Sequence, residues 1–446
     1  MANAMTSAQR VLSVFEELLG MQIPVHVRCW DGTEAGPEGV VCIVFTNRRA
    51  LRHVLWSPNQ LGLVRAFVSG DLDIEGDVFE LLSLPGLVAN LGAATVGVLP
   101  KKTVAAAALS LARLGALGPR PPRPAIEVAP RRGIKHSRTR DSSSVSHHYD
   151  VGNDFYRTLL GSSMVYSCGY WAGPSERAGG GDAGLDQAQY DKLDLVCRKL
   201  GLTPGMRLLD VGCGWGSMAI HAAKHYGVSV VGVTLSNEQH RWALDRVAAE
   251  GLSESVEIRV QDYRDIDDGP YDAISSIGMS EHVGDARLAE YADTLLGLLR
   301  PTGRLLNHAI ASVGSVTTRG DSVDAHMSDF IERYIFPDGE ILPLSRTLDA
   351  FERAGLEVRD VETLREHYAL TLRAWISRLQ HEWTRAVWLV GEARCRTWLL
   401  YLVGSALGFE EAGRLTIHQV LAVRPDAEGS SGLPRTRAQW LGELEG

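Results

Sequence analysis

From residue 147 onward, short apolar runs alternate with longer amphipathic stretches. The apolar runs are short and rich in β-branched residues, which predicts β-strands. We expect strands at residues 207–211, 228–233, 256–260, 271–277, 304–310, 356–364 and 416–423. Helices are expected around residues 221–225, at 237–250, 286–299 and 344–354, and in a long tract that ends near residue 408. Strand and helix alternate at short spacing, which predicts a parallel, doubly wound α/β sheet.

The first 118 residues have a different pattern and predict a smaller α+β domain. A helical start is followed by two β-rich runs, 25–30 and 40–45, and the turn signals Asp31-Gly32 and Gly36-Pro37 lie between them. We expect these two runs to form a hairpin. Residues 49–84 are mostly helical in period. No nucleophile or metal-ligand constellation is present here, so we interpret the domain as a scaffold or a docking module.

Residues 87–117 raise the question of a membrane span, because they are rich in Ala, Leu, Val and Gly. The segment Pro100-Lys101-Lys102 divides them into two halves, and each half is shorter than the roughly 20 residues that a spanning helix needs. The second half, 103–117, fits a helix at a membrane interface. It fits equally well an Ala-rich helix that packs inside a domain.

Residues 119–146 are rich in proline, arginine and serine and predict a linker. Seven lysines and arginines lie between residues 120 and 140, against the single acid Glu127. Such a strip fits a solvated linker or a contact with anionic lipid. The expected organisation is therefore a first domain at 1–118, this linker, a second domain at 147–426 and a C-terminal tail at 427–446.

Composition narrows the class of protein. The chain has 446 residues, of which 45% are hydrophobic and 22% charged, enough for two or three domains with their own cores. Its formal charge of −9 gives no sign of a nucleic-acid partner. The six cysteines form no C-x-x-C pair and no cluster with histidine at zinc spacing, so we expect no metal site and a reduced, cytoplasmic compartment. No secretory signal is expected from the first residues.

A glycine-rich turn follows the expected strand at 207–211. It reads RLLDVGCGWGSMAIHAAKHYG, with Asp210 directly before Gly212, Gly214 and Gly216. Glycine lets the backbone turn sharply and lets a ligand approach it, and the following helix presents unpaired amides. The spacing misses the dinucleotide pattern by one residue. Together with Asp210 and the GVTLS end of the next strand, it is typical of S-adenosylmethionine-dependent methyltransferases.

The end of that next strand departs from the general methyltransferase plan. It reads Thr234-Leu235-Ser236 and lacks an acid for the ribose hydroxyls of the cofactor. Asp262 and Tyr263 follow the third strand and lie where an adenine amine and ring could be held. The alternative is that they are solvated polar residues of a loop.

Seven motifs follow one another along the second domain. They are HHYDVGNDFY (147–156), MVYSCGYW (164–171), LLDVGCGWG (208–216), GVTLSNEQ (232–239), GMSEHVG (278–284), RYIFPDGEILP (333–343) and HYALTLRAW (367–375). In order and spacing they resemble cyclopropane-fatty-acid synthases and the related mycolic acid methyltransferases. GDLDIEGD at 70–77 also resembles the extra N-terminal domain of full-length synthases that act on phospholipid acyl chains. The resemblance implies a class I, Rossmann-like methyltransferase fold.

The resemblance also implies a reaction. A methyl group passes from S-adenosylmethionine to a carbon of a cis double bond, and the resulting carbocation then loses a proton. A bicarbonate ion would serve as the general base, in a cradle formed by Cys168, Glu281, His308, the backbone of Ile310, and Tyr368. The cofactor would be bound by Tyr149, Tyr166, Ser167, Asp210, Gly212, Gly214, Gly216, Thr234, Leu235, Gln239, Asp262 and Tyr263. The candidates for the acyl-chain tunnel are Tyr334, Ile335, Phe336, Leu372, Trp375 and Leu379.

The product and the partners stay open at this point. The motifs favour a 10-methylene branched chain, as in the first step of 10-methyl fatty acid synthesis, where a separate reductase completes the branch. The alternatives are a cyclopropane ring from the same cation, methylation of a small molecule, and a lipid-binding protein without catalysis. We expect a cytoplasmic enzyme that associates peripherally with the inner face of the membrane to reach an unsaturated phospholipid, and a homodimer formed through the first domain.

Overall fold

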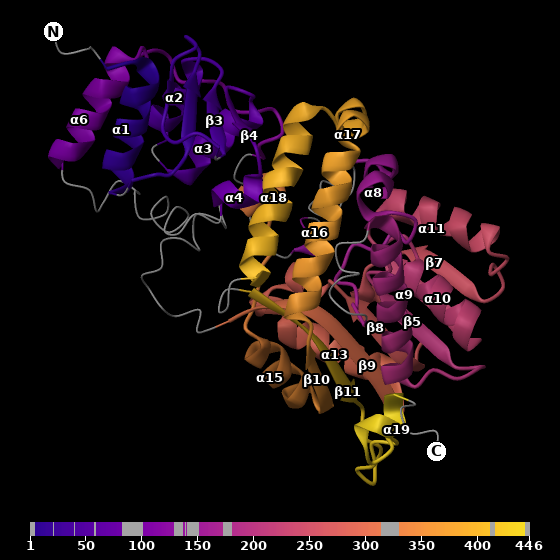
Figure 1. The fold of residues 1–446 in the computed structure, drawn as a ribbon. Helices are drawn as coiled ribbons and strands as arrows, with labels where there is room; N and C mark the ends of the chain where they lie inside the picture. Colours follow the sequence, from indigo (N-terminus) through magenta and orange to yellow (C-terminus); the bar gives the residue numbers. More distant parts are fainter. Residues whose placement is uncertain are drawn as a thin grey trace. The chain divides into compact units, whose positions relative to one another are not determined.

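The computed structural model describes residues 5–20, 22–39, 41–57, 59–82, 101–128, 137–138, 140, 151–172, 181–313, 330–410 and 415–441. The chain divides into two compact units, whose elements are labelled in Figure 1. The first unit contains Met1–Arg131, Thr318–Pro337 and Trp383–Leu407, and the second contains the rest. Both units are therefore discontinuous along the chain, in contrast to the linear division expected from the sequence.

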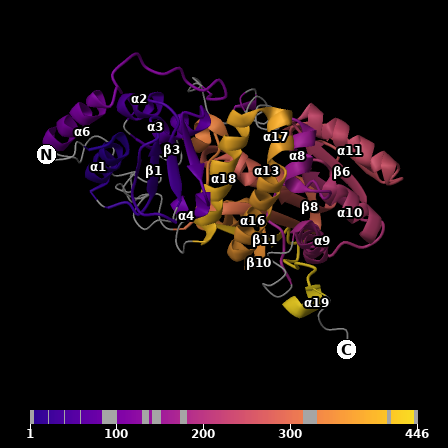
Figure 2. The ribbon, with the colours of Figure 1, turned by 45° about the horizontal axis from the view of Figure 1, so that its top comes forward.

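The first unit is built on a four-stranded sheet in the order β2-β1-β3-β4 (Figures 1 and 2). Its strands are β1 (His26–Cys29), β2 (Glu34–Ala35), β3 (Cys42–Phe45) and β4 (Leu72–Glu75). The hairpin expected between residues 25–30 and 40–45 is wrong, because β1 and β3 pair in parallel. Each of the two turn signals reverses the chain, so the short strand β2 lies between them and forms the hairpin with β1 instead.

Helices cover this sheet and supply most of the core of the first unit. They are α1 (Ser7–Leu19), α2 (Arg49–Trp56), α3 (Gln60–Val68), α4 (Val78–Leu82) and α6 (Lys101–Arg113). The Ala-rich helix α6 buries Ala107 and Leu111 in the same apolar cluster as Val11 and Val27. This packing favours the packed helix over the interfacial one for residues 103–117. Within the described parts of the chain, no helix is long and apolar enough to cross a bilayer.

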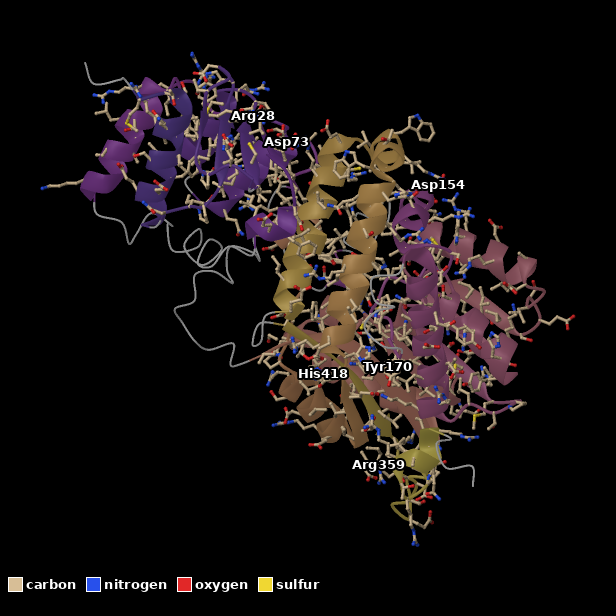
Figure 3. All side chains as sticks on the ribbon, in the orientation of Figure 1. Arg28, Asp73, Asp154, Tyr170, Arg359 and His418 are labelled. Atoms are coloured by element: carbon tan, nitrogen blue, oxygen red, sulfur yellow. The ribbon has the colours of Figure 1, made fainter. Side chains whose placement is uncertain are left out.

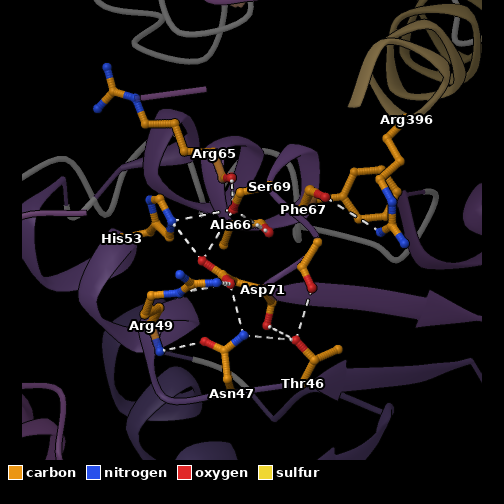
Figure 4. A network of polar contacts seen from close by, with 11 residues as sticks. Thr46, Asn47, Arg49, His53, Arg65, Ala66, Phe67, Ser69, Asp71 and Arg396 are labelled. Atoms are coloured by element: carbon orange, nitrogen blue, oxygen red, sulfur yellow. Dashed lines mark hydrogen bonds and ion pairs between the residues drawn. The ribbon is translucent and has the colours of Figure 1, made fainter. Parts of the chain in front are cut away.

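A buried polar network joins α2 to the start of β4 (Figure 4). The Asp71 carboxylate accepts hydrogen bonds from Asn47 Nδ2 at 2.8 Å and from Arg49 Nη2 at 2.7 Å. Its second oxygen lies 3.1 Å from His53 Nε2. Asp71 and His53 are both almost fully buried, so the network satisfies groups that would otherwise be costly to bury. Its hydrogen bonds explain why Asp71, the first acid of the GDLDIEGD motif, is buried, whereas the end of the motif at residues 75–77 is exposed.

Two segments from later in the sequence belong to the first unit. In α18 (Glu392–Glu410), Arg396 pairs with Asp73 at 3.0 Å, and its guanidinium lies over the Phe67 ring. Glu127, from the expected linker, is fully buried and pairs with Arg65 at 2.6 Å. Part of the region interpreted as a linker is therefore anchored in the core.

The second unit contains a seven-stranded sheet in the order β10-β11-β9-β8-β5-β6-β7. Its strands are β5 (Arg207–Val211), β6 (Ser229–Thr234), β7 (Val256–Val260), β8 (Tyr271–Ile277), β9 (Leu299–Ser312), β10 (Glu357–Thr363) and β11 (Leu415–Val423). The five strands from β7 to β9 are parallel, whereas β11 is antiparallel to both of its neighbours. The chain changes direction across the sheet between β5 and β8, which is where open α/β sheets place ligands. The predicted doubly wound sheet is confirmed.

Helices pack on both faces of this sheet (Figures 1 and 2). They are α8 (Asn153–Leu160), α9 (Gly181–Leu200), α10 (Ser217–Tyr226), α11 (Asn237–Ala249), α12 (Ser280–Val283), α13 (Leu288–Leu298), α15 (Leu344–Ala354) and α16 (Arg365–His381). Leu208 joins one apolar cluster and Leu209 the other, because successive side chains of a strand point to opposite faces. Two further helices lie in the C-terminal part of the chain. Helix α17 (Trp383–Val390) belongs to the first unit, and α19 (Arg437–Leu441) belongs to the second.

Candidate active site

The glycine-rich turn connects β5 to α10 at the carboxyl edge of the parallel strands. The amides of Gly212 and Cys213 both donate to the Val233 carbonyl at 3.0 Å, which ties the turn to β6. Gly214 has a φ of 55°, and a Cβ built on it would have Gln239 Nε2, at 4.0 Å, as its nearest neighbour. The backbone at Gly214 therefore faces open space, as a ligand-binding turn requires.

Asp210, at the end of β5, is buried directly beside this turn. Its Oδ1 accepts a hydrogen bond from Ser275 Oγ at 2.7 Å, whereas its Oδ2 is buried without a protein partner. Burial raises the pKa of the Asp210 carboxyl to about 6. Asp210 can therefore accept a hydrogen bond from a bound ligand.

The end of β6 forms a second polar edge next to the glycine turn. Thr234 Oγ1 donates to Gln239 Oε1 at 2.8 Å, and the Ser236 side chain caps α11 by accepting from the Gln239 amide. These bonds fix the Gln239 side chain near Gly214. Thr234 and Gln239 thus lie beside the glycine turn, and Leu235 follows Thr234 along the chain. Their binding of the cofactor stays a prediction.

Asp262 and Tyr263 lie at the end of β7, but Asp262 already has a strong partner. Both of its oxygens accept from the Arg264 guanidinium, at 2.8 and 2.6 Å, and this pairing lowers the pKa of the Asp262 carboxyl against the opposing effect of burial. Tyr263 is buried and meets Tyr291 edge to face at 5.5 Å between ring centroids. An adenine amine at Asp262 would have to share the carboxylate with Arg264.

A loop at 161–172 carries Tyr166, Ser167 and Cys168 between two helices. On the α9 side, Gln189 Nε2 donates to the Ser167 carbonyl at 2.8 Å and Lys192 Nζ donates to Ser167 Oγ at 3.0 Å. On the α16 side, three contacts hold the same loop. They are Gly169 N to Thr371 Oγ1 at 3.0 Å, Trp171 N to His367 Nδ1 at 2.9 Å, and the Tyr170 ring stacked on His367 at 4.9 Å. Tyr170 is labelled in Figure 3.

The Cys168 thiol is fully buried between these helices and donates weakly to the Gly169 carbonyl. Burial raises the pKa of the thiol well above its ordinary value. Cys168 is therefore a neutral thiol at physiological pH and fits a hydrogen-bonding role better than a nucleophilic one.

Glu281 follows β8 on the short helix α12, and its side chain reaches across to β9. Its Oε1 accepts a hydrogen bond from the Ile310 amide at 2.8 Å, while its Oε2 is buried without a protein partner. Burial raises the pKa of the Glu281 carboxyl to about 7. The hydrogen bond joins two of the residues that the sequence assigned to one cradle.

His308 lies two residues before Ile310 on β9, so both side chains lie on the same face of the strand. It is fully buried, and neither ring nitrogen has a protein partner. Burial and the positive charges of Lys192 and Lys199 lower the pKa of His308 well below its ordinary value. The imidazole is therefore neutral, with one N–H donor and one acceptor available to a ligand.

A row of aromatic rings leads from the glycine turn to Tyr368. Its five successive pairs have ring centroids 4.7 to 6.1 Å apart. Along the row the rings are Trp215, Tyr156, Tyr166, Trp375, Tyr368 and Phe409. Ring faces attract cations, so the row offers a dry, cation-stabilising wall next to the cofactor turn.

The remaining predicted residues divide between the two units of the chain. Tyr149 lies outside the described residues. Tyr334 and Phe336 belong to the first unit, where the Tyr334 hydroxyl donates to Glu127 at 3.0 Å and the Phe336 ring meets Tyr401. The tunnel candidates Leu372, Trp375 and Leu379 belong to the second unit and are fully buried on α16.

Sequence reasoning missed two polar residues that hold the site, Gln189 and Lys192. Both lie on α9, a helix that was not predicted from the sequence. Gln189 and Lys192 are three residues apart, the spacing that places two side chains on the same face of a helix. That spacing was the available signal, but a lysine on an amphipathic helix is usually solvated.

The chain is similar to a protein family, to curated proteins and to solved structures. Residues 136–420 match the family model described as "Mycolic acid cyclopropane synthetase". The chain is 40% identical over 423 residues to "Probable fatty acid methyltransferase" of Pseudomonas putida, covering 94% of this chain and 97% of that protein. It is 37% identical over 277 residues to "Cyclopropane-fatty-acyl-phospholipid synthase" of Escherichia coli, covering 62% of this chain and 66% of that protein. The solved mycolic acid cyclopropane synthase CmaA1, complexed with SAH and CTAB, superposes with a TM-score of 0.58 at 34% identity, covering 63% of this chain and 97% of that one.

Proposed function

The chain belongs to the mycolic acid cyclopropane synthetase family, and we propose that it transfers a methyl group from S-adenosylmethionine to a cis double bond of an unsaturated phospholipid acyl chain. The name of a relative that matches almost the whole chain is "Probable fatty acid methyltransferase". The solved relative holds SAH, the demethylated form of the proposed donor. The glycine turn, the buried Asp210 and the open space at Gly214 supply a matching site in this chain.

One observation carries the proposal most directly. The second oxygen of Glu281 and both ring nitrogens of His308 are buried and have no protein partner. An alkene needs no deprotonation before it attacks a sulfonium, but the cation that forms must lose a proton in a site from which water is excluded. A buried carboxyl and a neutral imidazole, near an aromatic row, suit that second step.

The same unpartnered atoms fit a bound bicarbonate. A protonated Glu281 would donate from Oε2, and His308 would donate from its single N–H. The Cys168 thiol donates to the Gly169 carbonyl in this structure and would have to turn to add a weak donor. Bicarbonate would supply the general base that accepts the proton of the cation. The chain's own residues would hold and orient it, with the Ile310 amide fixing Glu281 in place.

We further propose that the product is a 10-methylene branched chain. Methyl transfer to one alkene carbon leaves the positive charge on the other, and a hydride shift moves it to the carbon that bears the new methyl group. Loss of a proton from that methyl group then gives the methylene branch, a C=CH2 group on the chain. A separate reductase would complete the branch. Loss of the same proton before the hydride shift closes a cyclopropane ring, which is the alternative product.

A phospholipid substrate requires contact with a membrane surface, and we propose peripheral association with its inner face. Helix α6 packs into the core of the first unit through Ala107 and Leu111, but Leu109 on the same helix is 53% exposed, and we propose it as a point of contact. Two of the four described arginines of the linker support the association less, because Arg138 pairs with Asp265 and Arg140 pairs with Asp338. The other two, Arg120 and Arg123, are exposed. Sedimentation with anionic vesicles tests the association, and Leu109→Ser should reduce the bound fraction.

The first experiment is incubation of the purified protein with S-adenosylmethionine and vesicles of an oleoyl phospholipid. The released fatty acids are then analysed by mass spectrometry and proton NMR. A gain of one CH2 supports the proposal. In the NMR spectrum, the vinylidene protons of a C=CH2 group indicate the branched product, and upfield ring protons indicate the cyclopropane. No mass change on any unsaturated lipid would reject it and favour a small-molecule methyltransferase.

A further inference from the structure

Lys192 is a buried cation at the centre of the candidate site, and the reaction described above gives it no role. It lies on α9 with no exposed surface. Its Nζ donates to Ser167 Oγ at 3.0 Å, and Gln189, one turn earlier, donates to the Ser167 carbonyl at 2.8 Å. One face of α9 therefore holds both the backbone and the side chain of Ser167.

The surroundings of Lys192 contain several titratable groups from different elements. It interacts electrostatically with Cys168 of the 161–172 loop, Asp210 of β5, His221 of α10 and His308 of β9. Among these four groups, Asp210 is the one that can carry a negative charge near neutral pH. Burial lowers the pKa of Lys192 to about 8 and raises that of Asp210 to about 6, so both are ionised between these values.

A second buried lysine of the same helix, Lys199, has a structural role and can be compared with Lys192. Lys199 is equally buried, but its ammonium pairs with Glu362, lies 3.6 Å from Asp360 and donates to Gln419. Two carboxylates at this range balance its charge. At Lys192 the contact is a neutral hydroxyl, and Asp210 interacts with it only through space. The charge of Lys192 is therefore less fully balanced by the protein, and a bound anion would balance it.

We propose that Lys192 is a positioning residue that holds Ser167 against the carboxyl end of β5 and, through Ser167, draws the carboxylate of the methionine part of S-adenosylmethionine into place. This inference rests on the proposed function. The aromatic contacts place Tyr166, next to Ser167, one ring away from Tyr156 and two from Trp215 of the glycine turn. The same loop is also tied to the end of the glycine turn, because Ser217 Oγ donates to the Ser163 carbonyl at 2.6 Å. The ammonium of Lys192 interacts with Asp210, which lies just before the turn.

Calorimetric titration with S-adenosylhomocysteine tests the inference without any lipid substrate. Lys192→Met keeps the length of the side chain and removes its charge, and we expect it to weaken binding about ten- to a hundredfold, the range for a hydrogen bond to a charged group. Ser167→Ala should have a similar effect, and the double variant should bind no more weakly than Lys192→Met alone, because the two residues act as one unit.

Two controls separate this role from a structural one. Lys199→Met removes the other buried charge of α9 and should lower the unfolding temperature while leaving the affinity for S-adenosylhomocysteine unchanged. The second control is 5′-methylthioadenosine, which lacks the carboxylate, and Lys192→Met should bind it as tightly as the unchanged protein does. The affinity of the unchanged protein for S-adenosylhomocysteine should also fall more steeply above pH 8 than that of Lys192→Met.

The outcomes are distinguishable. Equal binding of S-adenosylhomocysteine by Lys192→Met and the unchanged protein overturns this inference alone. Equal losses for S-adenosylhomocysteine and 5′-methylthioadenosine overturn the carboxylate assignment. A failure of the unchanged protein to bind S-adenosylhomocysteine overturns the proposed function and this inference together. If Lys192→Met does not fold, Ser167→Ala decides, since it removes the hydroxyl and leaves the buried charge in place.

Discussion

Glu281 is the residue whose replacement should separate catalysis from binding. Glu281→Gln keeps the hydrogen bond from the Ile310 amide but removes the titratable oxygen that has no partner. Gln can still donate a hydrogen bond to a bound bicarbonate, but it cannot exchange a proton with it. If Glu281 relays the proton that bicarbonate takes from the cation, turnover on oleoyl phospholipid vesicles should fall about a hundredfold or more, the usual contribution of proton transfer in a site, with unchanged affinity for S-adenosylhomocysteine. Glu290→Gln, an exposed change on α13, is the control and should retain full turnover. Full activity in Glu281→Gln would reject the proposed mechanism.

The raised pKa of Glu281 also predicts how stability depends on pH. Its folded-state pKa of about 7 lies above the ordinary value of 4.5, so the folded protein binds this proton more tightly than the unfolded chain does. Its contribution to stability is therefore largest below pH 4.5 and is lost as the pH rises to about 7. Between pH 4.5 and 8, Glu281→Gln should gain up to about 3 kcal/mol relative to the unchanged protein in urea unfolding. Parallel curves for the two proteins would show that Glu281 does not titrate in this range.

At the same scale, sequence reasoning was limited by what cannot be seen along the chain. It grouped Glu281 with the Ile310 backbone, and the hydrogen bond between them is present. It did not predict the ion pair between Arg264 and the Asp262 carboxylate, because a two-residue spacing in a turn does not determine where a side chain points. It missed Lys192 because burial of a lysine depends on tertiary contacts with the 161–172 loop.

Among the elements, the glycine turn between β5 and α10 allows a matched comparison. Gly214 and Gly251 have similar positive φ values, 55° and 67°, and neither would crowd an added Cβ. Alanine at either position should therefore cost a similar free energy of unfolding, about 1 kcal/mol. Only Gly214→Ala places a methyl group where the cofactor would approach, so it should weaken S-adenosylhomocysteine binding tenfold or more while Gly251→Ala does not. Equal affinities in the two variants would argue against cofactor binding at this turn.

The accuracy of the predicted elements follows how strongly each pattern constrains the backbone. Residues 207–211, 256–260 and 271–277 were predicted with the bounds of β5, β7 and β8, because buried parallel strands are continuous apolar runs. In the first unit, pairing partners depend on tertiary packing, which no local pattern encodes. The two β-rich runs there were found, but their mutual orientation was wrong.

The organisation of the whole molecule is less predictable than its elements, because each compact unit contains segments from distant parts of the sequence. The first unit takes in Trp383–Leu407, which a linear reading places inside the methyltransferase domain. Local periodicity identifies that segment as helical but does not say which core receives it. The ion pair between Arg396 and Asp73 and the buried pair between Glu127 and Arg65 join residues 323 and 62 positions apart.

This organisation predicts that residues 1–118 cannot be removed cleanly. Their loss would leave Glu127 without Arg65 and Arg396 without Asp73. Breaking the buried pair of Glu127 and Arg65 from one side costs about 3–5 kcal/mol. The pair of Arg396 and Asp73 contributes less, because the Asp73 side chain is 41% exposed and solvent screens it. The truncated protein should unfold at a lower temperature, bind a hydrophobic dye and self-associate in light scattering. Arg65→Met in the full chain isolates one of these pairs and should reproduce part of the destabilisation without self-association. If instead the truncated protein stays monomeric, keeps its unfolding temperature and excludes the dye, then Trp383–Leu407 does not depend on the first 118 residues for its packing.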